Sequence, residues 1–503
     1  MLYLDEALQE NAMMEVIRDV SFASRIEKLQ NPDFEKEYVP DSLKGILREY
    51  QKAGAAWIGM LYSNQFGGIL ADDMGLGKTL QVISFLLVEH TGCSLIVCPA
   101  SLVYNWKHEL ERFAPSLKAD MVTGNVQQRK EVLDRWKEVD VLITSYDLLR
   151  RDITDYQELH FFCEVIDEAQ YIKNHGTQAA RAVKQVQTGF RLALTGTPIE
   201  NRLSELWSIF DYLMPGYLYS YQRFRTELEQ PIVQHKDEDA AKRLQRLIRP
   251  FVLRRLKKEV LQDLPDKLEE NLYADMDGEQ QELYDAHVRR MKLMLEEKSD
   301  EEIRTDKIEI LAELTRLRQL CCDPALLYDN YKGGSAKTEL VRGLIRNAVE
   351  NGHKVLLFSQ FTTMLERLYR ILEEEKIASH MLTGATPKEK RIEMVESFAH
   401  DEVPVFCISL KAGGTGLNLT AADVVIHFDP WWNSAVQNQA TDRAHRIGQK
   451  NVVNVYRILA KGTIEEKIVE LQERKLQLSD RILGGESLQA QGLTREELLE
   501  LLR

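Results

Sequence analysis

Cysteine is scarce in this chain, with six residues among 503. None of them forms a C-x-x-C pair with a second such pair, so neither a disulfide framework nor a structural zinc site is predicted. No apolar run approaches the ~18 residues that span a bilayer, and the first residues, MLYLDEALQE, are acidic where a signal peptide is basic and then apolar. We therefore expect a cytoplasmic protein that has no membrane partner.

Positive charge is in deficit, because 65 Lys and Arg face 79 Asp and Glu, a formal net charge of −14. Taken alone, this deficit argues against nucleic acid as a partner. Net charge is a sum over the whole surface, however, and a cleft can be basic on an acidic protein. Residues 241–260, AKRLQRLIRPFVLRRLKKEV, hold eight Lys or Arg and one Glu. Binding to nucleic acid is therefore not excluded.

Two series of short apolar segments organise the chain, with helical patterns between them. The first series covers residues 67–70, 95–101, 141–147, 164–169 and 192–198, and the second covers 354–361, 403–410, 423–430 and 452–459. Continuous β-branched runs that alternate with helices are typical of buried parallel strands. Between the series, from 204 to 351, the pattern changes to long charged helices. The sequence therefore predicts two tandem α/β domains with helical insertions between them.

A glycine-rich turn follows the first of these strands. The stretch GILADDMGLGKTL ends in Gly77, Lys78 and Thr79, the tail of the phosphate-binding pattern G-x-x-x-x-G-K-[ST], although Asp72 stands where the first glycine belongs. A strand, a turn and a helical pattern follow in the order that a phosphate cradle needs. Gly75 and Gly77 would let backbone N–H groups face phosphates, Lys78 would reach the β/γ oxygens and Thr79 would hold Mg²⁺. A residue other than glycine is tolerable at the first position if its backbone φ need not be positive. The alternative is that this stretch is a glycine turn that arose by chance and binds no nucleotide.

Two carboxylates, Asp167 and Glu168, end a later apolar strand. At that place Asp167 would bind Mg²⁺ and Glu168 would orient the attacking water. An isolated Asp-Glu pair is more often surface charge, but behind a phosphate loop it indicates a catalytic pair.

The segments DDMGLGKT, VIDEAQ, LTGTPIEN (194–201) and LREYQKAGAAWI resemble the motifs of superfamily-two helicase-like ATPases. The resemblance implies that Gln51 recognises the adenine edge and that Thr195 and Thr197 couple the nucleotide state to movement. Gln170 stands where many members have His, which bears on the strength of coupling. An Asp at the start of the loop is the usual form in one branch of this superfamily.

The second α/β domain has no phosphate loop of its own. Its glycine-rich segment, SLKAGGTGLNLT (409–420), lacks a following Gly-Lys-Thr. If NQATDRAHRIGQK (438–450) is helical through Arg446, then Gln439, Arg443 and Arg446 share one face. Two guanidiniums there suit a γ-phosphate that is bound by the other domain. A salt-bridged exposed helix is the alternative.

The branch is indicated by DPWWNSAVQNQATDRAHRIGQ (429–449), SLKAGGTGLNLT, LIVCPASLVYNW (95–106), RPFVLRR (249–255) and LPDK (264–267). These segments resemble the SWI/SNF-type DNA-dependent ATPases, including their bacterial and archaeal relatives, over about residues 41–480. The resemblance implies an N-terminal helical segment (1–40), a RecA-like ATP-binding domain with a helical protrusion (41–260), a helical insertion (261–350), a second RecA-like domain (351–465) and a helical tail (466–503). No appended chromatin-reading segment is expected in the chain.

The resemblance also implies a set of site residues. The nucleotide site would include Gln51, Asp72, Asp73, Met74, Gly75, Leu76, Gly77, Lys78, Thr79 and Gly416, the catalytic set Lys78, Asp167, Glu168, Arg443 and Arg446, and the coupling set Gln170, Thr195, Thr197 and Gln439. Contacts to DNA phosphates would come from Ser101, Asn105, Trp106, Ser145, Tyr146, Ser359, Gln360, Lys411, Gly413, Gly414, Trp431 and Trp432. For Trp431 and Trp432, and for the segment RPFVLRR, a structural role in domain packing is the alternative to DNA contact.

The prediction is an ATP- and Mg²⁺-dependent motor, active as a monomer, that moves along double-stranded DNA without separating the strands and remodels a DNA-bound protein complex. It would be associated with the nucleoid, or nuclear in a eukaryote. A strand-separating DNA or RNA helicase and a nucleotide-gated DNA clamp with slow hydrolysis are the alternatives.

Overall fold

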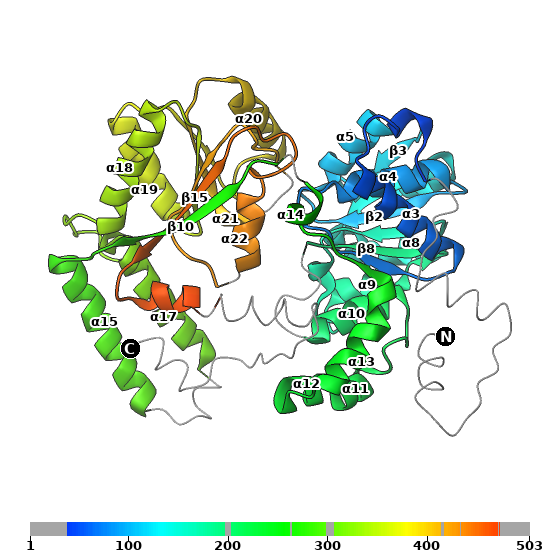
Figure 1. The fold of residues 1–503 in the computed structure, drawn as a ribbon, viewed down its shortest axis with the longest axis horizontal. Coiled ribbons are helices and arrows are strands. Elements are labelled where there is room, and N and C mark those ends of the chain that lie inside the picture. Colours follow the sequence, from blue (N-terminus) through cyan, green and yellow to red (C-terminus); the bar gives the residue numbers. More distant parts are fainter. Residues whose placement is uncertain are drawn as a thin grey trace. The chain divides into compact units, whose positions relative to one another are not determined.

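The computed structural model describes residues 38–196, 203–261, 264–297, 306–413, 417–432, 434–470 and 472. The chain divides between Gln262 and Asp263 into two compact units. Among the described residues, unit 1 precedes this point and unit 2 follows it, and each contains one large parallel sheet with helices packed around it (Figure 1). The predicted α/β class with two tandem parallel sheets is confirmed.

The sheet of unit 1 has seven strands in the order β3-β4-β2-β6-β8-β1-β9, and all pairs are parallel. The strands are β1 (Gly68–Leu70), β2 (Ser94–Cys98), β3 (Ala119–Met121), β4 (Val141–Ser145), β6 (Glu164–Ile166), β8 (Arg191–Leu194) and β9 (Val252–Leu253). The five strands predicted in this half are present. The sequence analysis missed β3 and β9, which are short edge strands with little apolar pattern of their own.

Helices connect these strands because parallel neighbours need crossover connections. Before β8 they are α3 (Glu49–Ser63), α4 (Lys78–Val88), α5 (Val103–Phe113), α6 (Val126–Asp134), α7 (Tyr146–Arg151), α8 (Ile153–Tyr156) and α9 (Gln178–Gln185), and after it α10 (Leu203–Leu213), α11 (Tyr221–Phe224), α12 (Gln230–His235), α13 (Glu238–Ile248) and α14 (Lys257–Val260). A small two-stranded sheet pairs β5 (His160–Phe161) with β7 (Gln187–Thr188). Part of the basic segment lies on α13, which buries Leu244 and Leu247 at helical spacing.

The sheet of unit 2 has six strands in the order β10-β15-β14-β11-β13-β12, again all parallel. They are β10 (Lys267–Ala274), β11 (Val355–Ser359), β12 (Ser379–Leu382), β13 (Val405–Ser409), β14 (Val424–His427) and β15 (Val453–Ala460). The four predicted strands are present. The helical insertion predicted for 261–350 also contains a strand, β10, which pairs with the whole of β15. The sequence of β10, KLEENLYA, is polar, so pairing with β15 decides its conformation.

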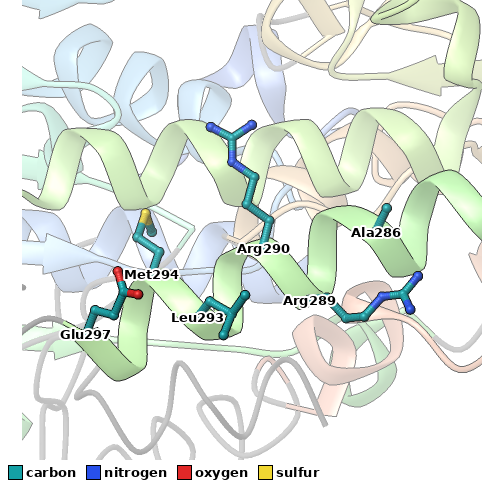
Figure 2. A pocket seen from close by; sticks show the side chains of 6 residues that line it. All are labelled: Ala286, Arg289, Arg290, Leu293, Met294 and Glu297. Atoms are coloured by element: carbon teal, nitrogen blue, oxygen red, sulfur yellow. The ribbon is translucent and has the colours of Figure 1, made fainter.

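The helices of unit 2 are α15 (Gly278–Glu297), α17 (Lys307–Cys322), α18 (Ala336–Glu350), α19 (Thr362–Glu374), α20 (Lys388–His400), α21 (Leu410–Gly413) and α22 (Ser434–Thr441). The long charged helix predicted around residue 285 is α15, which packs with α17 in one apolar cluster through Met291 and Leu317. A pocket of about 590 Å³ lies along α15 and is lined by six residues of that helix alone (Figure 2). No strand end or glycine loop lines this pocket.

The predicted helices within 1–37 and 473–503 lie outside the described residues. Among the residues that are described, no helix combines the length and the apolar character needed to cross a bilayer. All six cysteines are buried free thiols.

Candidate functional site

The predicted phosphate loop joins the carboxyl end of β1 to the first residue of α4. Gly75 and Gly77 have φ values of 88° and 76°, in the left-handed region that favours glycine. Asp72 is not among the residues with positive φ. The backbone at position 72 therefore does not need glycine, and an Asp is compatible with the first glycine position of the loop.

The first turn of α4 has the features of an anion site. Its N-cap is Gly77, which has no side chain to cap the helix, so the N-terminal N–H groups and the positive end of the helix dipole are directed toward the loop. The Lys78 ammonium donates to the carbonyl oxygens of Asp72 at 2.6 Å and Asp73 at 3.5 Å. Thr79 lies in the same turn and is half-buried. These groups fit a bound polyphosphate.

The Asp72 carboxylate is an internal group of unit 1. It is fully buried and forms an ion pair with Arg255. Its side chain is therefore bonded within unit 1, and the place of Asp72 in the nucleotide site stays a prediction. Among the other predicted loop residues, Leu76 is buried, and Asp73 and Met74 are half-buried.

Gln51 lies against the loop, as the resemblance implied. Its amide nitrogen donates to the Leu76 carbonyl at 3.0 Å, and its amide oxygen accepts from the Arg48 N–H at 2.9 Å. A Cβ on Gly77 would come within 2.4 Å of the Gln51 amide nitrogen. Gly77 is thus favoured by its φ, and any side chain there would displace the Gln51 amide. Recognition of adenine by Gln51 stays a prediction.

Asp167 follows β6 and lies at the same carboxyl edge of the sheet as the loop. Its Oδ2 accepts the indole N–H of Trp106 at 2.9 Å, and its Oδ1 accepts the Glu168 N–H at 2.8 Å. Burial, followed by the adjacent Glu168 carboxylate, raises the pKa of Asp167 above its ordinary value. A cation beside this carboxylate would relieve that unfavourable charge.

A chain of side-chain hydrogen bonds connects Glu168 to the end of β8. The Gln170 amide donates to Glu168 Oε2 at 2.7 Å, and the Thr195 hydroxyl donates to Gln170 Oε1 at 3.2 Å. Glu168 has a φ of 53°, an uncommon value for a residue with a side chain. Gln170, the departure from the usual His, therefore bridges two residues from the predicted catalytic and coupling sets. The other coupling residue, Thr197, lies outside the described residues.

The donors fit Mg²⁺ when it arrives with a nucleotide. Magnesium prefers oxygen ligands and is held in such sites by one or two carboxylates together with substrate phosphates. The chain offers the Thr79 hydroxyl and the Asp167 carboxylate. Among the described residues there is no group of three or more His, Cys, Asp or Glu side chains able to hold a metal by themselves. Phosphate oxygens would therefore have to complete the coordination.

The predicted helix through Arg446 is wrong. Helix α22 ends at Thr441, and the residues that follow form turns, with the Ala444 N–H bonded to the Thr441 carbonyl at 3.0 Å. Arg443 and Arg446 therefore do not share a helix face with Gln439, which lies on α22 itself.

The turn that carries the arginines is tied to the glycine-rich segment instead. The Leu419 N–H donates to the Arg443 carbonyl at 3.0 Å. The Gln449 amide donates to the carbonyls of Ala422 at 2.8 Å and Ala444 at 3.2 Å. The carbonyls of Arg443 and Ala444 accept these bonds, so they do not accept the bonds that would continue the helix. Within unit 2, Arg443 is buried and Arg446 is half-buried.

Four of the predicted DNA contacts are internal groups. Trp106, Ser145, Tyr146 and Ser359 are all buried. The Trp106 indole binds Asp167, the Tyr146 hydroxyl donates to the Asp167 carbonyl at 2.8 Å, and the Ser359 hydroxyl donates to Asp429. Ser145 caps α7. These bonds give the four side chains a structural role, and their contact with DNA stays a prediction.

The two tryptophans after β14 are half-buried and pack within unit 2. The Arg318 guanidinium, itself 2% exposed, lies 5.5 Å from the Trp431 ring and 5.9 Å from the Trp432 ring. This packing supports the structural interpretation, and their contact with DNA stays a prediction. Ser101, Asn105 and Gln360 are half-buried. Lys411 and Gly413 lie on α21, whose side chains at these positions are not described, and Gly414 and Gly416 lie outside the described residues.

The role of Trp106 was missed from the sequence. Trp106 and Asp167 are 61 residues apart and lie on different elements, and nothing in either local pattern marks them as partners. Because Trp106 belongs to the segment LIVCPASLVYNW, it was predicted to contact DNA. In the structure its indole is buried and donates to Asp167, the predicted magnesium ligand.

Two family descriptions match the chain: the SNF2-related domain over residues 50–326 and the helicase conserved C-terminal domain over residues 336–448. The protein YwqA of Bacillus subtilis, named as a helicase/translocase, is 41% identical over 479 residues, covering 92% of this chain and 51% of its own. A human SWI/SNF-related regulator of chromatin, subfamily A member 1, is 35% identical and covers 96% of this chain and 48% of its own.

Among solved structures, the Sulfolobus solfataricus SWI2/SNF2 ATPase core in complex with dsDNA is 37% identical, covers 87% of this chain and 93% of that chain, and has a TM-score of 0.45. The chain spans about half the length of the curated relatives it matches. The SNF2-related match by itself takes in more than half of this chain, and the phosphate loop and the Asp167-Glu168 pair fall within it. This chain therefore belongs to the SNF2-related family of helicase superfamily two.

Proposed function

We propose that this chain is a DNA-dependent ATPase that translocates on double-stranded DNA. The observation that carries the proposal is the arrangement in unit 1. A phosphate loop with left-handed glycines lies at the same sheet edge as Asp167 and the bonded series Glu168, Gln170 and Thr195. Hydrolysis needs a phosphate cradle, a cation ligand and a group that positions water, and these residues supply one of each.

The hydrolytic step follows from these groups. Backbone N–H groups of the loop and the Lys78 ammonium bind the phosphates and balance their charge. Glu168 orients the attacking water and polarises it, while Gln170 fixes the orientation of the carboxylate. When Mg²⁺ is bound, it neutralises charge on the phosphate oxygens, and Asp167 and Thr79 would hold it. Thr195, bonded to Gln170, communicates the state of the site to the end of β8.

Arg443 and Arg446 are proposed to stabilise charge on the γ-phosphate in the transition state. Guanidinium groups match phosphate oxygens in geometry and keep their charge. The turn that carries them is fixed by the bonds of Gln449 and Leu419. The support for this role is the chemistry of the two side chains together with the family to which the chain belongs.

Movement along duplex DNA is supported by the relatives. One is named a helicase/translocase and another a regulator of chromatin. Tracking along phosphates leaves base pairs intact, whereas opening a duplex costs about 1.4 kcal/mol of stacking per step. We propose that the chain works as a monomer in the nucleoid or the nucleus and displaces proteins bound to DNA.

Two substrates test the proposal. The first is a triplex whose third strand is released by tracking, and the second is a forked duplex whose strands part only by unwinding. We expect ATP-dependent release of the third strand, no separation of the fork, and neither activity in Lys78→Ala. Separation of a long fork would favour a strand-separating helicase. ATP binding with neither hydrolysis nor third-strand release would favour a DNA clamp.

A further inference from the structure

The basic segment 241–260 buries apolar side chains such as Leu244 and Leu247 in unit 1, and it also directs the Arg255 guanidinium inward. Arg255 pairs with the fully buried carboxylate of Asp72: its Nε donates to Oδ1 at 2.9 Å, and its Nη2 donates to Oδ2 at 2.5 Å. Gln81 of α4 donates to the same Oδ2 at 3.1 Å. Both carboxylate oxygens are therefore bonded, and the buried charge of Asp72 is balanced by a single guanidinium.

The same guanidinium also joins the helices on either side of the loop. Its Nη1 donates to the Tyr50 carbonyl in α3, and its Nη2 donates to the Gln81 amide oxygen in α4 at 2.8 Å. Arg255 thus connects α3, α4 and the start of the phosphate loop. A lysine could not bond to this set, because one ammonium lacks the planar fork of donors.

Backbone bonds hold the segment of Arg255 to the loop as well. The Ala71 N–H donates to the Leu253 carbonyl at 2.7 Å, and the Asp73 N–H donates to the Arg255 carbonyl at 3.0 Å. The Lys257 N–H donates to the Asp73 carboxylate at 2.9 Å. The first half of the loop is therefore bonded, residue by residue, to β9 and the residues after it.

The Arg255 and Gln81 side chains pack closely against Gly54 of α3. A Cβ on Gly54 of α3 would lie 1.8 Å from the Gln81 amide oxygen and 2.8 Å from Arg255 Nη2. Lys78 donates to the carbonyl of Asp72 at 2.6 Å. The residue whose side chain is fixed by Arg255 therefore also contacts the lysine that binds phosphate.

We propose that Arg255 is a positioning residue for the nucleotide loop: through Asp72 it holds the loop backbone and Lys78 in the arrangement that accepts the phosphates of ATP. This inference rests on the proposed function, since it assigns Arg255 to the same nucleotide site. It also explains why Asp stands at the first glycine position, because the Asp72 carboxylate is the attachment point for the guanidinium.

The test is the double variant Asp72→Asn/Arg255→Met, which removes both charges together and leaves no unpaired buried ion. The matched control is Arg129→Met/Asp152→Asn. That pair is also bidentate, with bonds of 2.6 and 2.8 Å, and is similarly buried in unit 1. Arg129 also donates to the Gly124 carbonyl. Each protein is assayed for its melting temperature without nucleotide, for equilibrium binding of a fluorescent ATP analogue, and for KM and kcat.

We expect both double variants to fold and to lose similar amounts of melting temperature. Only Asp72→Asn/Arg255→Met should bind the analogue about 10- to 100-fold more weakly and show a raised KM for ATP, because displacement of a loop by even 1 Å has effects of this order. Unchanged affinity in that folded variant, or an equal loss in the control, would overturn the inference. Failure of the wild-type chain to bind ATP would instead overturn the proposed function.

Arg255→Lys separates charge from geometry. It keeps a positive charge near Asp72 but loses the fork that joins α3 and α4, so we expect a folded protein whose KM remains raised. A wild-type KM in Arg255→Lys would mean that charge balance alone is sufficient and that Arg255 does not position the loop.

Discussion

Replacing Trp106 with Phe tests the assignment of the catalytic carboxylates. Trp106 is 1% exposed, and its indole N–H donates to Asp167 Oδ2 at 2.9 Å. Phenylalanine keeps most of the apolar packing and removes this one donor. Asp167 retains its bond from the Glu168 N–H at 2.8 Å, so the carboxylate stays in place but is free to rotate away from the cation it is proposed to hold.

The magnitude follows from the type of bond. A hydrogen bond to a charged group contributes about 1.5–3 kcal/mol, and each 1.36 kcal/mol corresponds to tenfold in rate. We therefore expect kcat for ATP to fall about 10- to 100-fold and the Mg²⁺ concentration for half-maximal turnover to rise. The smaller ring also leaves a cavity, which should cost about 1–3 kcal/mol of the free energy of unfolding.

Trp207→Phe is the control for that loss of packing. Trp207 is 7% exposed in the same unit, and its indole N–H donates to the Tyr219 carbonyl at 3.2 Å rather than to a carboxylate. The assay is steady-state ATP hydrolysis with duplex DNA across a Mg²⁺ titration, with melting temperatures measured in parallel. The reasoning is refuted if Trp106→Phe keeps the wild-type turnover and Mg²⁺ requirement, or if the two variants lose activity equally.

Glu168→Gln should bind a fluorescent ATP analogue normally and hydrolyse ATP at least ~100-fold more slowly, because it loses the carboxylate that we propose positions water; fast hydrolysis would transfer that role elsewhere. Burial outweighs the nearby Arg191 and raises the pKa of Glu164 from 4.5 to about 8, so the folded state keeps a proton that the unfolded chain has released. Unfolding by urea should therefore show the stability of unit 1 falling as pH rises between those two values, and Glu164→Gln should flatten this dependence. The Lys337 ammonium pairs with Glu465 at 2.8 Å with both side chains fully buried, so Lys337→Met should destabilise unit 2 by about 3–5 kcal/mol in the same assay. Lys337→Met/Glu465→Met should recover much of that loss, and a single variant as stable as wild type would contradict the pairing.

The strands and the phosphate loop were predicted from the sequence because their signals are local. A buried parallel strand is a short apolar run, and each of the nine predicted runs became a strand. The left-handed conformations of Gly75 and Gly77 are likewise a property of glycine itself. The polar strand β10 was missed because its conformation comes from pairing with β15, which is far away in the sequence.

The side chains around the site were predicted less well. Trp106 was assigned to DNA because its segment resembles a DNA-contacting motif, and only its burial revealed the bond to Asp167. Helical spacing placed Arg443 and Arg446 on one face, but the carbonyls of their turn bond to the glycine-rich segment and to Gln449, and the helix ends first. Tertiary bonds of this kind override local periodicity.

The sequence by itself determined the family, the two parallel sheets and the residues that could meet a nucleotide, since each depends on residue types at short and fixed spacings. The tertiary structure alone decided which charged groups are internal. Arg255 and Asp72 are 183 residues apart, and Arg255 belongs to a segment that reads as a basic surface stripe. Its guanidinium, 13% exposed, reaches Asp72 because the first half of the loop forms backbone hydrogen bonds with β9 and the residues after it. No local pattern encodes such a partner, because the free energy of pairing depends on desolvation and distance in the folded chain.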